Sequence, residues 1–387
     1  MGGTTRSARR NNIILIIASL ILIVILGAMF YQYKIYEKAQ SAYLQGVQEE
    51  QEAERIAKQE AEAAAEEAAE LALQEDMESS SFYQKLSKGY DVNILIVGDS
   101  IGATSGASAT EYRWTTLLDS YLTEQYGSNV TITNVSMGGN ASYAGYSRVM
   151  MLDDGIDYDL AIICYGQNDS TIDFSLYYET IIRAISSKYE KCSIISILES
   201  SQRTYTEKMV TIQEICDYYG IPTADTIAPF SEDYDSYTDD SVHPNDAGQA
   251  IYAETVETVI DNMVEAGTGF TDYNLTPINS GVTAFDNFRY ISADEFERTD
   301  EVTYTITGLS ISGILGIDYS YQSGDNLTEI YVDGELFVAP TVTFNYDFSQ
   351  RHILIVSDDC TVENEIKIVF SSTELADAFN GLIFSGE

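Results

Sequence analysis

The pattern of apolar and polar positions divides the chain into four stretches. Residues 13–31 form an uncharged apolar run, and residues 32–78 are rich in alanine, glutamate and glutamine. Residues 90–266 alternate between short apolar runs and segments with apolar residues at helical spacing. Residues 282–387 carry strand-like runs, with no helix-length periodicity before the last dozen residues. The pattern therefore predicts an apolar helix, an exposed helix, an α/β domain and an all-β domain, in that order.

The apolar run Ile13–Tyr31 is long enough to cross a bilayer as a helix, which takes roughly 20 residues. Because Arg6, Arg9 and Arg10 precede it, the positive-inside rule predicts a cytoplasmic tail over residues 1–12 and the folded domains outside the cell. A cleaved signal peptide is the alternative, although its apolar core usually spans about 7–15 residues. We favour an uncleaved single-pass membrane anchor, which together with few cysteines suits a Gram-positive bacterial surface.

Residues 32–88 are expected to form a helical stalk, because alanine and glutamate favour helices and the stretch contains no proline. A continuous helix over residues 32–78 would reach on the order of 70 Å at 1.5 Å per residue. The apolar positions are mostly alanine, without a clear a/d heptad of larger residues, so a strong coiled coil is not expected. Weak self-association of the stalk stays open, and the oligomeric state is not predicted.

Residues 89–266 alternate strands and helices, which predicts a mostly parallel sheet with helices on both faces. The single tryptophan, Trp114, is interpreted as helix packing rather than as a sugar-binding surface. A polar linker is expected over residues 267–282. The predicted strands are Asn93–Val97, Val130–Val135, Leu160–Tyr165 and Ser193–Leu198, and the predicted helices are Trp114–Tyr126, Leu176–Lys188, Glu207–Tyr219 and Ala247–Glu265.

Residues 283–387 are expected to form a small antiparallel β-sandwich or jelly roll. The dipeptide Asp333-Gly334 is typical of a tight hairpin between two of its strands. The predicted strands are Val302–Thr307, Thr328–Val332, Leu336–Val338, Arg351–Val356 and Glu365–Phe370.

The composition excludes several classes of function. A net charge of -41 would repel a phosphate backbone, so nucleic acid is not an expected partner. The four cysteines form no CxxC pair, although a disulfide between Cys192 and Cys216 stays open. With only two histidines, His243 and His352, a multi-histidine metal centre is not expected, and no cofactor is indicated.

Ser100 is the first candidate for chemistry. It follows the apolar run Asn93–Val97 in a Gly-Asp-Ser turn, and a helix follows that turn. Such a turn lies at the carboxyl edge of an α/β sheet, where ligands usually bind. A single serine in a turn is more often a turn former or a helix cap, so the assignment depends on residues further along the chain.

A hydrolytic serine needs a base, an acid that orients the base, and donors for an oxyanion. Asp240 and His243 lie three residues apart before a predicted helix, where the carboxylate could fix the tautomer of the imidazole. Asn168 and Gly139 each follow a predicted strand, and they could supply a side-chain amide and a backbone N–H. Each signal alone has an ordinary reading, as a solvated histidine, an Asx turn or a flexible loop.

Together, these motifs resemble the SGNH (GDSL-type) hydrolase family over roughly residues 90–266. The resemblance departs from the family pattern at Ile101, where the family name has leucine. It implies a flavodoxin-like three-layer α/β/α fold for this region. The matching blocks are Gly98-Asp99-Ser100, Gly139, Gly166-x-Asn168-Asp169 and Asp240-x-x-His243.

The resemblance also implies a role for each residue. Ser100 would be the nucleophile, His243 the general base and then acid, and Asp240 the orienting carboxylate. The backbone N–H groups of Ser100 and Gly139 and the side chain of Asn168 would form the oxyanion hole. Two further acids, Asp99 and Asp169, are interpreted as structural residues that brace turns.

The C-terminal domain resembles, more loosely, the jelly-roll accessory modules of carbohydrate esterases. The segments Tyr331–Glu335 and Arg351–Val356 carry this likeness, and His352 is interpreted as structural.

The leading hypothesis is an extracellular serine esterase that removes acyl groups, acetyl first, from a polysaccharide or cell-wall glycan. An acyltransferase to a surface glycan would use the same triad, and a non-catalytic glycan-binding surface protein is a third hypothesis. Acylated carbohydrate or another small ester is the expected substrate, and the membrane is the expected partner of the apolar helix. Neither the ester nor a role of the β domain in substrate binding is predicted.

Overall fold

A computed structural model describes residues 5–153, 155–273 and 276–386 of the chain. The first residues of the predicted cytoplasmic tail, two residues of the predicted linker and the last residue of the predicted β domain lie outside the described residues. Residues 1–78 and residues 79–387 make up two separate units, which are described in turn.

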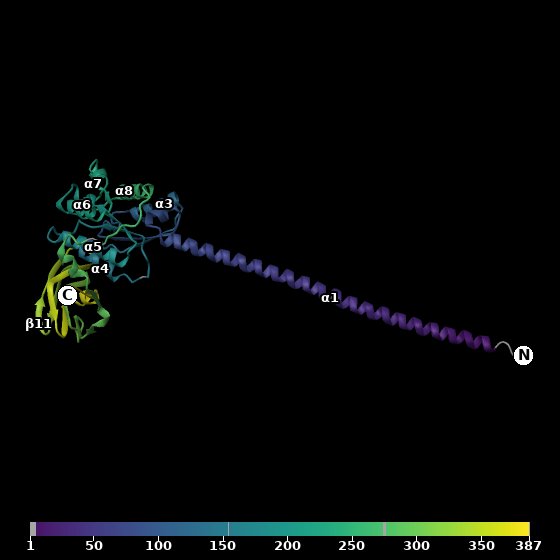
Figure 1. The fold of residues 1–387 in the computed structure, drawn as a ribbon. Coiled ribbons are helices and arrows are strands. Elements are labelled where there is room, and N and C mark those ends of the chain that lie inside the picture. Colours follow the sequence, from purple (N-terminus) through teal and green to yellow (C-terminus); the bar gives the residue numbers. More distant parts are fainter. Residues whose placement is uncertain (1–4, 154, 274–275, 387) are drawn as a thin grey trace. The chain divides into compact units, whose positions relative to one another are not determined.

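The first unit is a single helix, α1 (Thr5–Glu78), which is 74 residues long (Figure 1). The large apolar side chains between Ile13 and Tyr31 are all exposed on it. By length and composition this helix could cross a membrane, and it is the one helix of the described chain that could. The predicted membrane segment and residues 32–78 of the predicted stalk therefore belong to one uninterrupted helix, whereas residues 79–88 belong to the second unit and include the short helix α2 (Phe82–Ser87).

The second unit begins with an α/β domain around a five-stranded parallel sheet in the order β2-β1-β3-β4-β5. This is the strand order of flavodoxin-like folds, and it confirms the predicted fold class. The strands are β1 (Val92–Gly98), β2 (Val130–Asn134), β3 (Leu160–Cys164), β4 (Ser193–Leu198) and β5 (Thr223–Asp225).

Helices cover both faces of this sheet because its central strands are apolar on both sides. Ile94 and Ile96 pack with one set of helices, whereas Leu95 and Val97 pack with the other. Trp114 is fully buried at the start of α3, and its Nε1 donates to the Ile101 carbonyl. The first set is α2 (Phe82–Ser87), α3 (Trp114–Tyr126) and α8 (Asp246–Glu265); the second is α4 (Ser142–Met151), α5 (Phe174–Lys188) and α6 (Glu207–Tyr219); the short α7 (Ile227–Phe230) follows β5.

The C-terminal domain consists of two antiparallel sheets packed around an apolar core, as predicted. One sheet has the order β11-β10-β14-β8-β7, with β12 paired to β10, and the other has the order β13-β9-β15-β6. Asp333 and Gly334 both have positive φ in the turn between β10 and β11, as the hairpin signal predicts. The elements are β6 (Phe288–Ser292), β7 (Glu297–Arg298), β8 (Thr303–Thr307), β9 (Ile311–Tyr321), β10 (Gly324–Val332), β11 (Glu335–Val338), β12 (Thr341–Phe344), β13 (Gln350–Val362), β14 (Glu365–Phe370), α9 (Thr373–Asp377) and β15 (Phe379–Ser385).

The two domains of the second unit share an apolar contact. Ile353 on β13 and Ile383 on β15 are buried in the same cluster as Tyr143 and Tyr146 on α4. Beside this contact, the buried amide of Asn140 donates to the Arg351 carbonyl at 2.8 Å and accepts from the Ile353 N–H at 2.9 Å. The β domain is therefore attached directly to the loop that precedes α4.

Candidate active site

The turn after β1 holds Ser100 at the carboxyl edge of the parallel sheet. Gly98 is needed there for space, because a Cβ atom on it would lie 2.7 Å from the Cys164 carbonyl oxygen. Oδ1 of the buried Asp99 accepts the Ile101 N–H at 2.9 Å and closes the turn. Only 8% of Ser100 is exposed, so the residue is largely covered by its neighbours.

His243 lies in the loop before α8 and connects Ser100 to Asp240. Its Nε2 is 2.9 Å from the Ser100 Oγ, and its Nδ1 is 2.6 Å from the Asp240 Oδ2. Ser241 has a left-handed φ of 73°, which lets the short turn bring the carboxylate back to the ring. The side chain of Asn245 caps α8 by accepting the Gly248 N–H, which fixes the end of this loop.

The environment of Asp240 keeps it ionised. Its partial burial acts to raise the pKa, but the hydrogen bonds from the His243 ring and from the backbone N–H groups of His243 and Val242 lower the pKa to about 2. A carboxylate that stays charged at neutral pH can hold the proton on Nδ1 and stabilise an imidazolium, while Nε2 faces the serine hydroxyl.

Two backbone donors beside Ser100 are open. Within the described residues, neither the Ser100 N–H nor the Gly139 N–H makes a hydrogen bond. Gly139 has a left-handed φ of 73° and is exposed, so its peptide is reachable from solvent. Two such donors next to a serine hydroxyl can hold the oxygen of a tetrahedral intermediate.

Asn168 is exposed at the same edge of the sheet, but its amide already has partners. Its Nδ2 donates to the Asp99 Oδ2 and to the Asn140 carbonyl, both at 3.2 Å. For Asn168 to donate to an oxyanion as the sequence predicts, one of these long bonds must be shared or exchanged. The contact with Asp99 also holds the amide in place beside the nucleophile turn.

A buried group of carboxyls lies beneath the Asn168 loop, and sequence reasoning missed one of its members, Glu199. Burial raises the pKa of Asp99 to about 7 and raises the pKa of Glu199 well above its usual range, and each acts on the other. Burial also raises the pKa of Asp169, whose Oδ1 accepts the Ser142 N–H at the start of α4. These acids brace the loops of the site, and their burial favours the protonated form of each.

The β domain also reaches the site, which the sequence did not predict. A Cβ atom built on Gly138 would lie 2.8 Å from the Gln350 Nε2 and 3.6 Å from the Ser100 Cβ. One built on Gly139 would lie 3.0 Å from the His352 Cε1. Side chains of β13 therefore line the glycine loop next to the nucleophile. No local sequence pattern could reveal this contact, because it joins residues more than 200 positions apart in the sequence.

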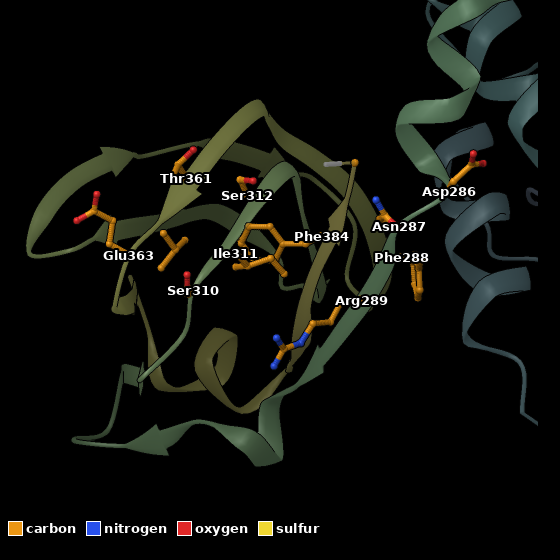
Figure 2. Close-up of a pocket in the computed structure, with 12 residues that line it drawn as sticks. Asp286, Asn287, Phe288, Arg289, Ser310, Ile311, Ser312, Thr361, Glu363 and Phe384 are labelled. Atoms are coloured by element: carbon orange, nitrogen blue, oxygen red, sulfur yellow. The ribbon is translucent and has the colours of Figure 1, made fainter.

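A large hollow lies elsewhere, on the β domain (Figure 2). It has a volume of about 620 Å³, and residues of β6, β9, β13 and β15 line it, among them Arg289, Ile311 and Phe384. None of Ser100, His243 or Asp240 belongs to its lining.

The cysteines and acids give no sign of a metal or redox centre. All four cysteines are free and buried, so Cys192 and Cys216 do not pair. In the part of the chain that the structure describes, no group of three or more histidine, cysteine, aspartate or glutamate side chains is arranged to hold a metal ion.

Comparison with known proteins identifies the α/β domain. Residues 96–251 match the model of the GDSL-like lipase/acylhydrolase family. This part of the chain is a GDSL-like acylhydrolase domain. This domain has the fold and the motifs of an SGNH serine hydrolase. No curated protein sequence matches the chain.

Solved structures extend the likeness beyond the acylhydrolase domain. A two-domain esterase active on acetylated mannans, crystallised with mannopentaose, has 19% identity and a TM-score of 0.62, and the match covers 81% of this chain and 94% of that one. The same type of esterase without mannopentaose matches with 19% identity and a TM-score of 0.60, over 81% of this chain and 95% of that one. An acetylxylan esterase from Geobacillus stearothermophilus has 18% identity and a TM-score of 0.37, over 45% of this chain and 98% of that one. These likenesses concern the fold.

Proposed function

We propose that this acylhydrolase is a membrane-anchored, extracellular esterase that removes acetyl groups from a polysaccharide or cell-wall glycan. The observation that carries the proposal is the unbroken hydrogen-bonded series from Asp240 through His243 to Ser100, beside two open backbone donors. The substrate class rests on the two-domain architecture shared with an esterase that is active on acetylated mannans.

The geometry supports a two-step acyl transfer to water. Nε2 of His243 takes the proton of Ser100 while Oγ attacks the ester carbonyl, and Asp240 stabilises the resulting imidazolium. The N–H groups of Ser100 and Gly139 hold the oxyanion, with Asn168 as a third donor. The intermediate expels the sugar alcohol, which takes its proton from His243. A water molecule, deprotonated by His243, then cleaves the acyl-enzyme and releases acetate and Ser100.

Acetate release tests the reaction. The full chain in detergent micelles should release acetate from acetylated oligosaccharides and from p-nitrophenyl acetate, and a fluorophosphonate probe should label it. Ser100→Ala should lose both the turnover and the label, whereas Ser105→Ala, in the same turn region, should keep them. Turnover that persists in the Ser100→Ala variant contradicts the mechanism. Acetyl transfer to an added acceptor glycan in place of acetate release would make the protein a transferase.

The location follows from α1. An exposed apolar segment preceded by Arg9 and Arg10 supports a single-pass anchor with the N-terminus inside. Protease added to intact cells should then remove the acylhydrolase domain while a tag at the N-terminus stays protected. Recovery of the domain in the medium, lacking α1, would show a cleaved signal sequence instead.

A further inference from the structure

The start of the edge strand β13 lies close to Ser100. A Cβ atom on Gly138 would lie 2.8 Å from the Gln350 Nε2 and 3.6 Å from the Ser100 Cβ, so a glycine is needed to keep the space between these two side chains open. Gly138 does not have a positive φ, so this space is the feature that a larger residue would remove. Asn140, two residues after Gly138, bonds through its amide to the backbone of Arg351 and Ile353, one and three residues after Gln350, which holds the two domains together here.

Gln350 is placed to bind something other than the protein. Its side chain is half-buried, and it makes no hydrogen bond within the described residues. A carboxamide offers two donor hydrogens and an acceptor oxygen, which is the combination that matches a sugar hydroxyl. The Gln350 amide atoms are not among the buried polar atoms without a partner, so water can reach them and a sugar hydroxyl can take the place of that water.

Aromatic side chains continue the surface away from Ser100. His352 stacks on Tyr321 with ring centroids 4.2 Å apart, and Phe344 lies edge-on to His352. Phe344 in turn contacts Tyr346 and Phe348, with centroids 5.1 and 5.7 Å away. Tyr346 and Phe348 are 59% and 56% exposed, which is unusual for neighbouring aromatic residues on a soluble domain.

We propose that residues 346–352 of the β domain are the carbohydrate-binding wall of the active site, where Gln350 hydrogen-bonds the acetylated sugar and Tyr346 and Phe348 stack on the adjoining sugars. This inference rests on the proposed esterase function and names its substrate more closely. Tyr346, Phe348 and Gln350 are uncharged, and the one exposed charge between the two aromatic residues, Asp347, is negative and disfavours an anionic polymer. The favoured substrate is therefore a neutral acetylated glycan, such as an acetylated mannan or xylan, rather than a uronic acid or phosphate-bearing polymer.

A Gln350→Ala variant separates sugar binding from chemistry. We expect kcat/KM on acetylated manno- or xylo-oligosaccharides to fall about 10-fold, mostly through KM, and to fall less on p-nitrophenyl acetate, which has no sugar for Gln350 to bind. The matched control is Gln322→Ala, because the Gln322 amide is already bonded to the Ser320 carbonyl in the same domain. An equal fall on both substrates would place Gln350 in the chemistry or in folding, and no fall on the oligosaccharides would remove it from the site. Either result overturns the proposal.

The aromatic part of the wall is tested by the double variant Tyr346→Ala/Phe348→Ala. It should weaken binding of acetylated oligosaccharides to the Ser100→Ala protein, measured by calorimetry, by about 10-fold or more, with longer oligosaccharides losing most. Phe337→Ala is the control, since Phe337 is an exposed aromatic residue of β11 in the same domain. Unchanged affinity in the double variant contradicts the proposal.

The results distinguish this inference from the function on which it rests. If the wild type hydrolyses acetylated glycans and the variants match it, the wall is wrong and the esterase stands. If the wild type hydrolyses p-nitrophenyl acetate but no acetylated glycan in the panel, the substrate class is wrong and the inference fails with it. Preference for acetylated uronic-acid polymers over neutral ones contradicts the inference alone.

Discussion

The loop before α8 and the start of β13 each place one histidine near Ser100, and the surroundings of these two histidines differ. His243 has a partner on each ring nitrogen, a serine hydroxyl and a carboxylate. His352 is stacked on Tyr321, its Nε2 is buried without a hydrogen-bond partner in the described structure, and burial lowers its pKa to about 4. The two histidines therefore differ in their surroundings: the proposed base His243 has partners for proton transfer, whereas His352 is packed in its neutral form, so closeness to Ser100 alone does not indicate a base.

Replacing His243 is expected to have the largest effect on activity, and replacing His352 tests the contrast between the two histidines. His243→Ala should lower kcat for p-nitrophenyl acetate by roughly 10⁴–10⁶-fold, because nothing else in the site can take the Ser100 proton. His352→Ala should lower it by no more than a few-fold. Steady-state kinetics on both variants, with near-ultraviolet circular dichroism as the control for folding, gives the contrast. Similar losses in the two variants would contradict the division of roles.

Replacing Asp240, the proposed orienting carboxylate, should have the next largest effect on kcat. Asp240→Asn keeps the size of the side chain but can present an N–H to the His243 Nδ1, which favours the wrong tautomer. We expect kcat to fall by roughly 10²–10⁴-fold with little change in KM. The exposed Asp239→Asn is the control in the neighbouring position. Since the pKa of Asp240 is about 2, its protonation should not limit wild-type activity between pH 4 and 8, which a pH profile of kcat/KM can check.

His352 should affect the pH dependence of the free energy of unfolding. Its pKa falls from the ordinary 6.5 to about 4 on folding, so the unfolded chain binds a proton more readily between these values. The contribution is absent above pH 6.5 and destabilises the protein progressively as the pH falls toward 4, by roughly 3 kcal/mol at most. His352→Phe should therefore lose less stability than wild type between pH 7 and 4 in urea unfolding. An unchanged pH dependence would show that the ring is accessible to protons.

The smallest effect concerns the buried acids beneath the Asn168 loop. Because burial raises the pKa values of Asp99 and Glu199, their protonated forms contribute to stability fully below the ordinary carboxyl pKa range, and this contribution is lost as the pH rises toward 7. Glu199→Gln should flatten this part of the stability profile, so that the variant loses less stability than wild type as the pH rises toward 7. Glu207→Gln, on an exposed position of α6, should leave the profile unchanged. A variant that loses stability equally at every pH would argue for packing instead.

The sequence predicts most of the α/β domain because its strands are apolar runs of ordinary length and its long helices have clear periodicity. It misses α4, whose small and aromatic residues are buried over most of the helix surface, and β5, which has only three residues. In the β domain it misses β9 and β15, where glycines interrupt the alternation.

The candidate site divides in the same way. Ser100, Asp240 and His243 could be selected from the sequence because each lies in a short motif with its own turn chemistry. Glu199 and Gln350 could not, since what matters for each is a contact with a loop distant in sequence. Burial of one acid against another, or of an amide against a glycine gap, has no local signature along the chain.

The Asn140 amide has a consequence for how the two domains can be handled. It directly follows Gly139 and pairs with the β13 backbone on both its oxygen and its nitrogen. Removing the β domain by ending the chain after α8 would leave the Asn140 amide without its partners and expose the apolar side of α4. The shortened protein is therefore expected to have an altered active site. Because Asn140 bonds to β13, a change in the position of the β domain would also move the peptide between Gly139 and Asn140.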